Sequence, residues 1–152
     1  MRNQGKGAAL PTTEATVIER EVRISASPET VFAFFTDPQK YVRWKGRHAE
    51  LDPRPGGLFR VEFETKDVAR GEFVEIEPYR RIVFTWGWEG EGHPIPPGTS
   101  TVEVTLVPDG DATVVRLVHH GLPEAAIPRH AEGWDLFLPR LVDAVAEHTT
   151  NE

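Results

Sequence analysis

The last third of the chain constrains the fold most. Residues 113–120 read Thr-Val-Val-Arg-Leu-Val-His-His, a glycine and a proline follow within three residues, and a long amphipathic segment comes next. Runs of β-branched residues that end at Gly and Pro are typical of strands, and apolar residues three or four positions apart are typical of helices. We therefore expect a strand, a tight turn and one helix that lies across a sheet. Such an arrangement can enclose a cavity.

The helix is predicted to run from about residue 124 or 128 to about residue 147. Pro139 lies inside it, where it removes one backbone hydrogen bond, so we expect a kink near Trp134 and Asp135. The apolar residues form a single stripe at helical spacing. The stripe consists of Ile127, His130, Ala131, Trp134, Phe137 or Leu138, Leu141, Val142 and Val145.

The first ordered element is predicted near residue 16, where apolar and polar residues begin to alternate up to residue 26. Ser27-Pro28-Glu29 predicts a helix start, because Ser caps a helix well and Pro suits the first helical position. A second short helix is predicted at residues 39–44. The two helices would form an insert after the first strand.

Further strands are expected after a turn cluster at residues 53–57. Asp109-Gly110 predicts a hairpin between the last two of them. The loop at residues 89–100 is too long for a tight hairpin, so it is either a lid over a site or a plain connector. The expected strands span residues 58–65, 68–77, 81–88, 101–107 and 113–120.

The length of 152 residues predicts one domain, at residues 15–150, after a disordered tail at residues 1–14. A net charge of −7 without any basic run disfavours nucleic-acid binding, which needs Lys and Arg against phosphates. No apolar run approaches the roughly eighteen residues that a membrane-spanning helix requires. We expect neither nucleic acid nor a membrane span.

The chain contains no cysteine, which excludes disulfides, thiolate nucleophiles and zinc–thiolate sites. The N-terminus lacks the apolar segment of a signal peptide. Neither a phosphate-binding glycine loop nor a dinucleotide fingerprint occurs. These features predict a cytoplasmic protein without a cofactor.

Five sequence motifs, in this order, resemble one branch of the START-like (helix-grip, SRPBCC) superfamily. Over residues 16–147 the chain is similar to the C-terminal domain of the activator of heat-shock-protein-90 ATPase. The motifs are Ile24-Ser-Ala-Ser-Pro-Glu-Thr-Val-Phe, Thr36-Asp-Pro with Trp44, Pro55-Gly-Gly-Leu-Phe-Arg, Gly71-x-Phe-x-Glu-Ile-x-Pro with Arg81-Ile-Val-Phe-Thr-Trp, and His119-x-Gly-Leu-Pro with His130-x-x-Gly-Trp.

The resemblance implies an α+β fold with a curved antiparallel sheet of six or seven strands. The sheet would wrap around the long C-terminal helix and leave a hydrophobic cavity between them. The superfamily includes lipid- and hormone-binding proteins, polyketide cyclases and co-chaperones, so the fold alone does not identify the activity. The chain departs from the co-chaperone pattern in having no separate N-terminal domain and in carrying Pro139.

Side-chain alternation predicts which residues face such a cavity. Each of them either lines a ligand pocket or fills the core, and Trp44 either closes one mouth of the cavity or anchors the insert to the sheet. An inward His119 could orient a ligand or be a structural histidine, and His130 could meet it across the cavity. The predicted ligand-binding residues are Trp44, Phe59, Phe63, Phe84, Trp86, Trp88, Val104, Leu117, His119, His130, Trp134 and Leu138.

His119 is also the one candidate for acid–base catalysis. It would need a carboxylate partner, which Glu75 or Glu103 could supply only if its strand register points it inward. His119 and His120 are adjacent on a strand and face opposite ways, so they cannot chelate one ion. No metal site is predicted.

Three functions are consistent with these features. The favoured one is binding of a hydrophobic or amphipathic small molecule without catalysis. The second is an enzyme of the cyclase or dehydratase type that uses His119, and the third is a co-chaperone-like module that contacts another protein. The missing N-terminal domain disfavours the third, and homodimerisation stays open.

Overall fold

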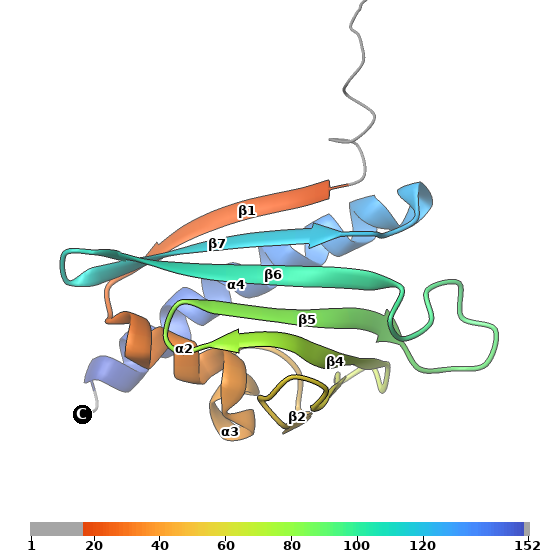
Figure 1. Ribbon diagram of the computed structural model, residues 1–152, viewed down its shortest axis with the longest axis horizontal. Coiled ribbons are helices and arrows are strands. Elements are labelled where there is room, and N and C mark those ends of the chain that lie inside the picture. The colour runs from red at the N-terminus through yellow and green to blue at the C-terminus, as the bar shows by residue number, and fades with distance from the viewer. Residues whose placement is uncertain (1–16, 151–152) are drawn as a thin grey trace, which may run out of the picture.

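The computed structural model describes residues 17–150, which form a seven-stranded antiparallel sheet and three α-helices (Figure 1). The sheet order is β1-β7-β6-β5-β4-β3-β2, so only β1 leaves the meander, and it pairs with the last strand. The strands are β1 (Val17–Ile24), β2 (His48–Leu51), β3 (Leu58–Glu62), β4 (Val68–Glu77), β5 (Arg81–Trp88), β6 (Ser100–Asp109) and β7 (Ala112–His120).

Two helices follow β1, and the third covers the sheet. Helix α2 (Pro28–Thr36) starts as predicted, because the Ser27 side chain accepts a hydrogen bond from Thr30 N. Helix α3 (Pro38–Tyr41) is a single turn capped by Asp37. After the 3₁₀ turn η1 (Glu124–Ala126), helix α4 (Ile127–Thr150) lies across one face of the sheet (Figure 1). This arrangement confirms the predicted helix-grip architecture.

The strand register assigns each face of the sheet. Val102 is opposite His119 and Val104 is opposite Leu117, so these side chains face α4 together. Their neighbours Glu103 and His120 lie on the outer face. The β6–β7 hairpin turns at Gly110, whose φ of 61° suits glycine, and this confirms the turn predicted at Asp109-Gly110.

Several elements differ from the sequence-based prediction. The second helix is Pro38–Tyr41, whereas residues 39–44 were predicted. Strand β2 was not predicted, because its four residues are too few to show a clear alternation of apolar and polar side chains. Strand β3 ends at Glu62, and the chain turns at residues 63–67. Helix α4 is continuous through Pro139, so the proline does not end it, and the kink stays a prediction. The predicted disordered tail lies outside the described residues.

Aromatic side chains fill the interior between the sheet and the helices. The Phe59 ring stacks on Phe84 with centroids 4.2 Å apart, and Phe73 and Tyr41 contact Phe59 edge-on. Phe59 is fully buried. Across residues 17–150, no helix has the length and apolar character needed to cross a membrane.

Replacing Phe59 with Ala should lower the free energy of unfolding by about 3–5 kcal/mol, because a fully buried ring leaves a cavity in a stacked cluster. Urea unfolding followed by circular dichroism measures the change. The matched control is Leu136→Ala on the exposed side of α4, which should change stability by less than about 0.5 kcal/mol. A Phe59→Ala loss as small as that of the control would contradict the packed core.

Candidate ligand-binding cavity

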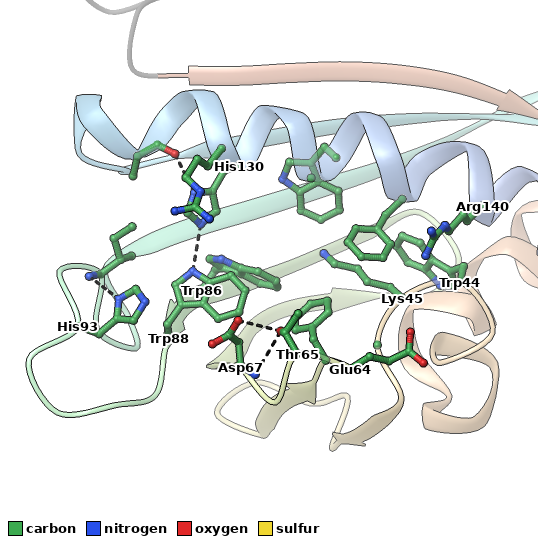
Figure 2. Close-up of a pocket in the computed structure, with 18 of the residues that line it drawn as sticks. Trp44, Lys45, Glu64, Thr65, Asp67, Trp86, Trp88, His93, His130 and Arg140 are labelled. Carbon is green, nitrogen blue, oxygen red and sulfur yellow. Dashed lines mark hydrogen bonds between the residues drawn. The ribbon is translucent and has the colours of Figure 1, made fainter.

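A cavity of about 1080 Å³ opens between the sheet and helix α4 (Figure 2). Four segments surround it: the turn between α3 and β2, the turn between β3 and β4, the end of β5 with the loop after it, and the first half of α4. Its aromatic wall consists of Trp44, Phe63, Trp86, Trp88, Trp134 and Phe137. Its polar and charged lining includes Arg43, Lys45, Glu64, Thr65, Asp67, His93, Arg129, His130 and Arg140.

The turn Trp44-Lys45-Gly46 forms one end of the cavity. Trp44 Nε1 donates to Phe34 O at 2.9 Å, which ties the turn to α2. Gly46 has a φ of 83°, and a Cβ there would lie 2.6 Å from Val61 Cγ1. Only glycine fits this close approach. Trp44 lines the cavity, and its hydrogen bond lies within the helical insert, so it does not by itself tie the insert to the sheet.

Lys45 is the side chain that sequence reasoning missed. It is 4% exposed, and its Nζ lies 3.6 Å from the Trp134 ring centroid and 4.4 Å from that of Trp86 (Figure 2). Its backbone N donates to Tyr41 O, but within residues 17–150 its side-chain amine has no hydrogen-bond or ion-pair partner. Burial lowers the pKa of Lys45 well below its ordinary value, because the ammonium loses water without gaining a carboxylate.

His119 is buried beside the cavity in a closed hydrogen-bond network. Trp134 Nε1 donates to its Nδ1 at 3.0 Å, so the ring proton is on Nε2. That Nε2 donates to Ser100 Oγ at 2.9 Å, and Ser100 in turn donates to Trp86 O at 2.9 Å. Burial, assisted by the nearby His130 and Lys45, lowers the pKa of His119 to about 3. His119 is therefore a neutral group with both nitrogens occupied.

His130 has an equally defined tautomer. Trp88 Nε1 donates to its Nε2 at 3.1 Å, so Nδ1 carries the proton and donates to Ala126 O at 2.8 Å. Burial lowers the pKa of His130. The rings of His119 and His130 lie edge-on, 5.5 Å apart. They do not meet across the cavity, which was the prediction, because His130 lines the cavity and His119 does not. The two histidines contact each other without a hydrogen bond between them.

The two candidate carboxylates do not reach His119. Glu103 accepts from Arg81 at 2.7 Å and is 2.7 Å from His120 Nε2 on the outer face. Glu75 pairs with the same arginine at 3.2 Å. The strand register explains this, because Glu75 and Glu103 both lie opposite Val83, whose neighbours Ile82 and Phe84 face inward. Glu75 and Glu103 do not point inward, so neither can act as the carboxylate partner of His119.

The loop between β5 and β6 forms one wall of the cavity. Trp88 N donates to Ile95 O at 2.7 Å, and Ile95 N donates to His93 Nδ1 at 3.1 Å. The His93 ring stacks over Trp88 with centroids 6.2 Å apart. These contacts join the middle of the loop to β5, and whether it opens as a lid stays a prediction.

The predicted ligand-binding residues fall into two equal groups. Those that line the cavity are Trp44, Phe63, Trp86, Trp88, His130 and Trp134. Those that are buried beside it without lining it are Phe59, Phe84, Val104, Leu117, His119 and Leu138. The second group faces inward as the alternation indicated, but other side chains cover it. Among residues 17–150, no cluster of three His, Asp or Glu side chains could hold a metal ion.

The lowered pKa of His119 makes stability depend on pH. The unfolded chain binds a proton at His119 below pH 6.5, whereas the folded protein resists protonation until about pH 3. Stability should therefore fall as the pH is lowered from 6.5 towards 3, by up to about 1.4 kcal/mol per pH unit from this group. Urea unfolding of wild type and His119→Gln over this range measures it. The variant should show a shallower slope, and an equal slope would contradict the buried neutral imidazole.

Comparison with known proteins gives the family. The family model described as Activator of Hsp90 ATPase homolog 1-like protein matches residues 25–146. The AHSA1-like protein RHE_CH02687 from Rhizobium etli is 41% identical, with a TM-score of 0.66, and the match covers 86% of this chain and 81% of that one. No curated protein matches the chain.

Two other solved structures share the fold. An HSP90 activator from Plasmodium falciparum is 27% identical with a TM-score of 0.69, over 83% of this chain and 93% of that one. DynU16, from the dynemicin biosynthetic locus, is 26% identical with a TM-score of 0.75 over 86% of this chain. The chain spans about half the length of DynU16, 47%. Because the family model spans most of the sequence and the Rhizobium relative is so similar, this chain belongs to the Activator of Hsp90 ATPase homolog 1-like family.

Proposed function

We propose that this protein binds a hydrophobic or amphipathic small molecule in the cavity between the sheet and helix α4. The cavity itself carries the proposal, since its volume of about 1080 Å³ is slightly above the roughly 300–1,000 Å³ typical of small-molecule sites and so is large enough for such a ligand. A well-packed interior leaves few voids larger than a water molecule, so a space of this size is not a packing defect.

The walls of the cavity favour an apolar or aromatic ligand body. Trp86 and Trp88 lie edge to face at 5.3 Å, and Trp134 tilts towards Trp86 at 6.2 Å. Indole rings provide large, rigid contact surfaces at little cost in side-chain entropy. DynU16, which shares this fold, is a protein of the dynemicin biosynthetic locus, and this supports a role with small molecules.

Acid–base catalysis has weaker support. His119 and His130 each use both ring nitrogens in hydrogen bonds. A general acid or base needs a free nitrogen within reach of the reacting proton. The geometry suits these histidines better to orienting the indole rings of Trp134 and Trp88 than to moving protons.

A second candidate is contact with a chaperone, which the family description and the Plasmodium relative favour. Such contact uses the outer surface and does not need the cavity. Wild type and Gly133→Phe should then stimulate the ATPase activity of HSP90 equally. A coupled ATPase assay that shows no stimulation by either protein would remove this candidate.

Gly133 offers a direct test of ligand binding. It lines the cavity from α4, and a Cβ added there would meet no atom within 4 Å, so a larger side chain would extend into open space. Gly133→Phe should weaken the binding of the fluorescent probe N-phenylnaphthylamine by about tenfold or more, because the ring occupies the ligand's place. Titration of the probe by fluorescence measures the dissociation constant.

The matched control is Gly133→Ala, whose methyl group occupies little of the space. It should raise stability by up to about 1 kcal/mol through helix propensity and change probe affinity at most a few-fold. Failure of wild type to bind the probe, or equal affinity in wild type and Gly133→Phe, would contradict binding in this cavity.

A further inference from the structure

We infer that the ligand carries an anionic group, such as a carboxylate or sulfonate, and that Lys45 binds this group deep in the cavity. The inference rests on the proposed ligand-binding function and names the chemistry that the site selects. Three independent features of the described residues support it: the burial of Lys45, the rings that surround it and the charge of the cavity lining.

The burial of Lys45 is the first. A lysine that is 4% exposed would normally have a carboxylate or several carbonyl groups at its ammonium, because burying an unpaired charge is costly. The neighbouring buried His119 has both of its nitrogens hydrogen-bonded, although among the described residues the buried Tyr41 Oη and Trp86 Nε1 have no partner. The side-chain amine of Lys45 has no hydrogen-bond or ion-pair partner within residues 17–150, although it borders the open cavity. The missing acceptor is therefore best supplied from the cavity.

The surrounding rings are the second feature. Nζ of Lys45 lies near the faces of Trp134 and Trp86, and more distantly near Trp44 at 5.8 Å and Phe137 at 5.7 Å. Ring faces attract a cation but accept hydrogen bonds poorly, so they do not replace a hydrogen-bond acceptor for the amine of Lys45. The rings also limit where Nζ can move. They hold a donor group in place beside the space that a ligand would fill (Figure 2).

The charge of the lining is the third feature. The cavity is lined by Arg43, Arg129, Arg140 and, in its charged form, Lys45, against two carboxylates, Glu64 and Asp67. Arg43 also lies 3.7 Å from Glu147, which does not line the cavity. The whole chain, in contrast, carries a net charge of −7. A positive excess concentrated in one concave site on an acidic protein attracts anions to that site.

The lowered pKa of Lys45 is the shift expected of an amine that is buried without a counter-charge. Burial without a counter-charge favours the neutral amine, whereas a bound anion within a few ångströms favours the ammonium. Occupancy by an anionic ligand would thus restore the charged form. A neutral ligand would leave the amine as it is.

Two fluorescent probes with the same aromatic body test the inference. Anilinonaphthalenesulfonate carries a sulfonate, and N-phenylnaphthylamine is the same body without it. Lys45→Met keeps the length and removes the charge, and it should weaken the sulfonate probe by about tenfold to a hundredfold, as expected for a charge-assisted hydrogen bond. Binding of the neutral probe should change less than about twofold. Lys40→Met removes the same charge from α3 outside the cavity and should leave both probes unaffected.

The outcomes separate the two proposals. Equal weakening of both probes by Lys45→Met, or no effect on the sulfonate probe, overturns the anion assignment while ligand binding stands. Failure of wild type to bind either probe overturns both. Gly133→Phe must displace the sulfonate probe too, since a probe that it does not displace is bound elsewhere and counts against the assignment. Near-UV circular dichroism checks that Lys45→Met is folded, and Lys45→Gln, which is polar but uncharged, replaces it if it is not.

Discussion

The hydrogen bond from Trp134 Nε1 to His119 Nδ1 joins helix α4 to the sheet where both border the cavity. It continues through Ser100 to the backbone of Trp86, so one chain of hydrogen bonds positions two of the indole rings that line the site. The Arg20–Asp135 ion pair, at 2.7 Å, holds the next residue of α4 against β1. A helix held at this point cannot settle further onto the sheet without breaking buried hydrogen bonds, each of which is expensive to lose in a dry interior. These contacts fix the position of α4 relative to the sheet beside the cavity.

His119 and Lys45 show how differently the fold treats two buried polar groups. His119 is complete: each nitrogen has a partner, and burial keeps the imidazole neutral. Lys45 is incomplete: aromatic rings surround its amine, and no acceptor faces it among the described residues. A polar group with all its partners stabilises one packing arrangement. A polar group that lacks a partner beside an open cavity can gain a hydrogen bond or an ion pair from a bound ligand, which lowers the free energy of the complex. This contrast is the reason why Lys45, and not His119, is proposed to bind the ligand.

Membership of the Activator of Hsp90 ATPase homolog 1-like family is compatible with either a cavity function or a surface function, because the same fold supports both. The proposed ligand binding rests on the large space walled by six aromatic rings, because closer packing of those rings would otherwise be expected to stabilise the domain.

Local patterns in the sequence determined most of the fold. Alternation at residues 81–88 and 101–120 predicted the inward and outward faces, Ser27-Pro28 predicted the start of α2, and helical spacing predicted α4 with Trp134 and His130 on its buried stripe. Only the tertiary structure decided which of the inward-facing residues line the cavity and which are buried beside it, as Phe59 is. It also decided that Lys45, in an irregular turn without periodicity, is buried. The physical reason is that strand and helix periods act over a few residues, whereas the contacts of Lys45 with Trp86 and Trp134 join segments far apart in the chain.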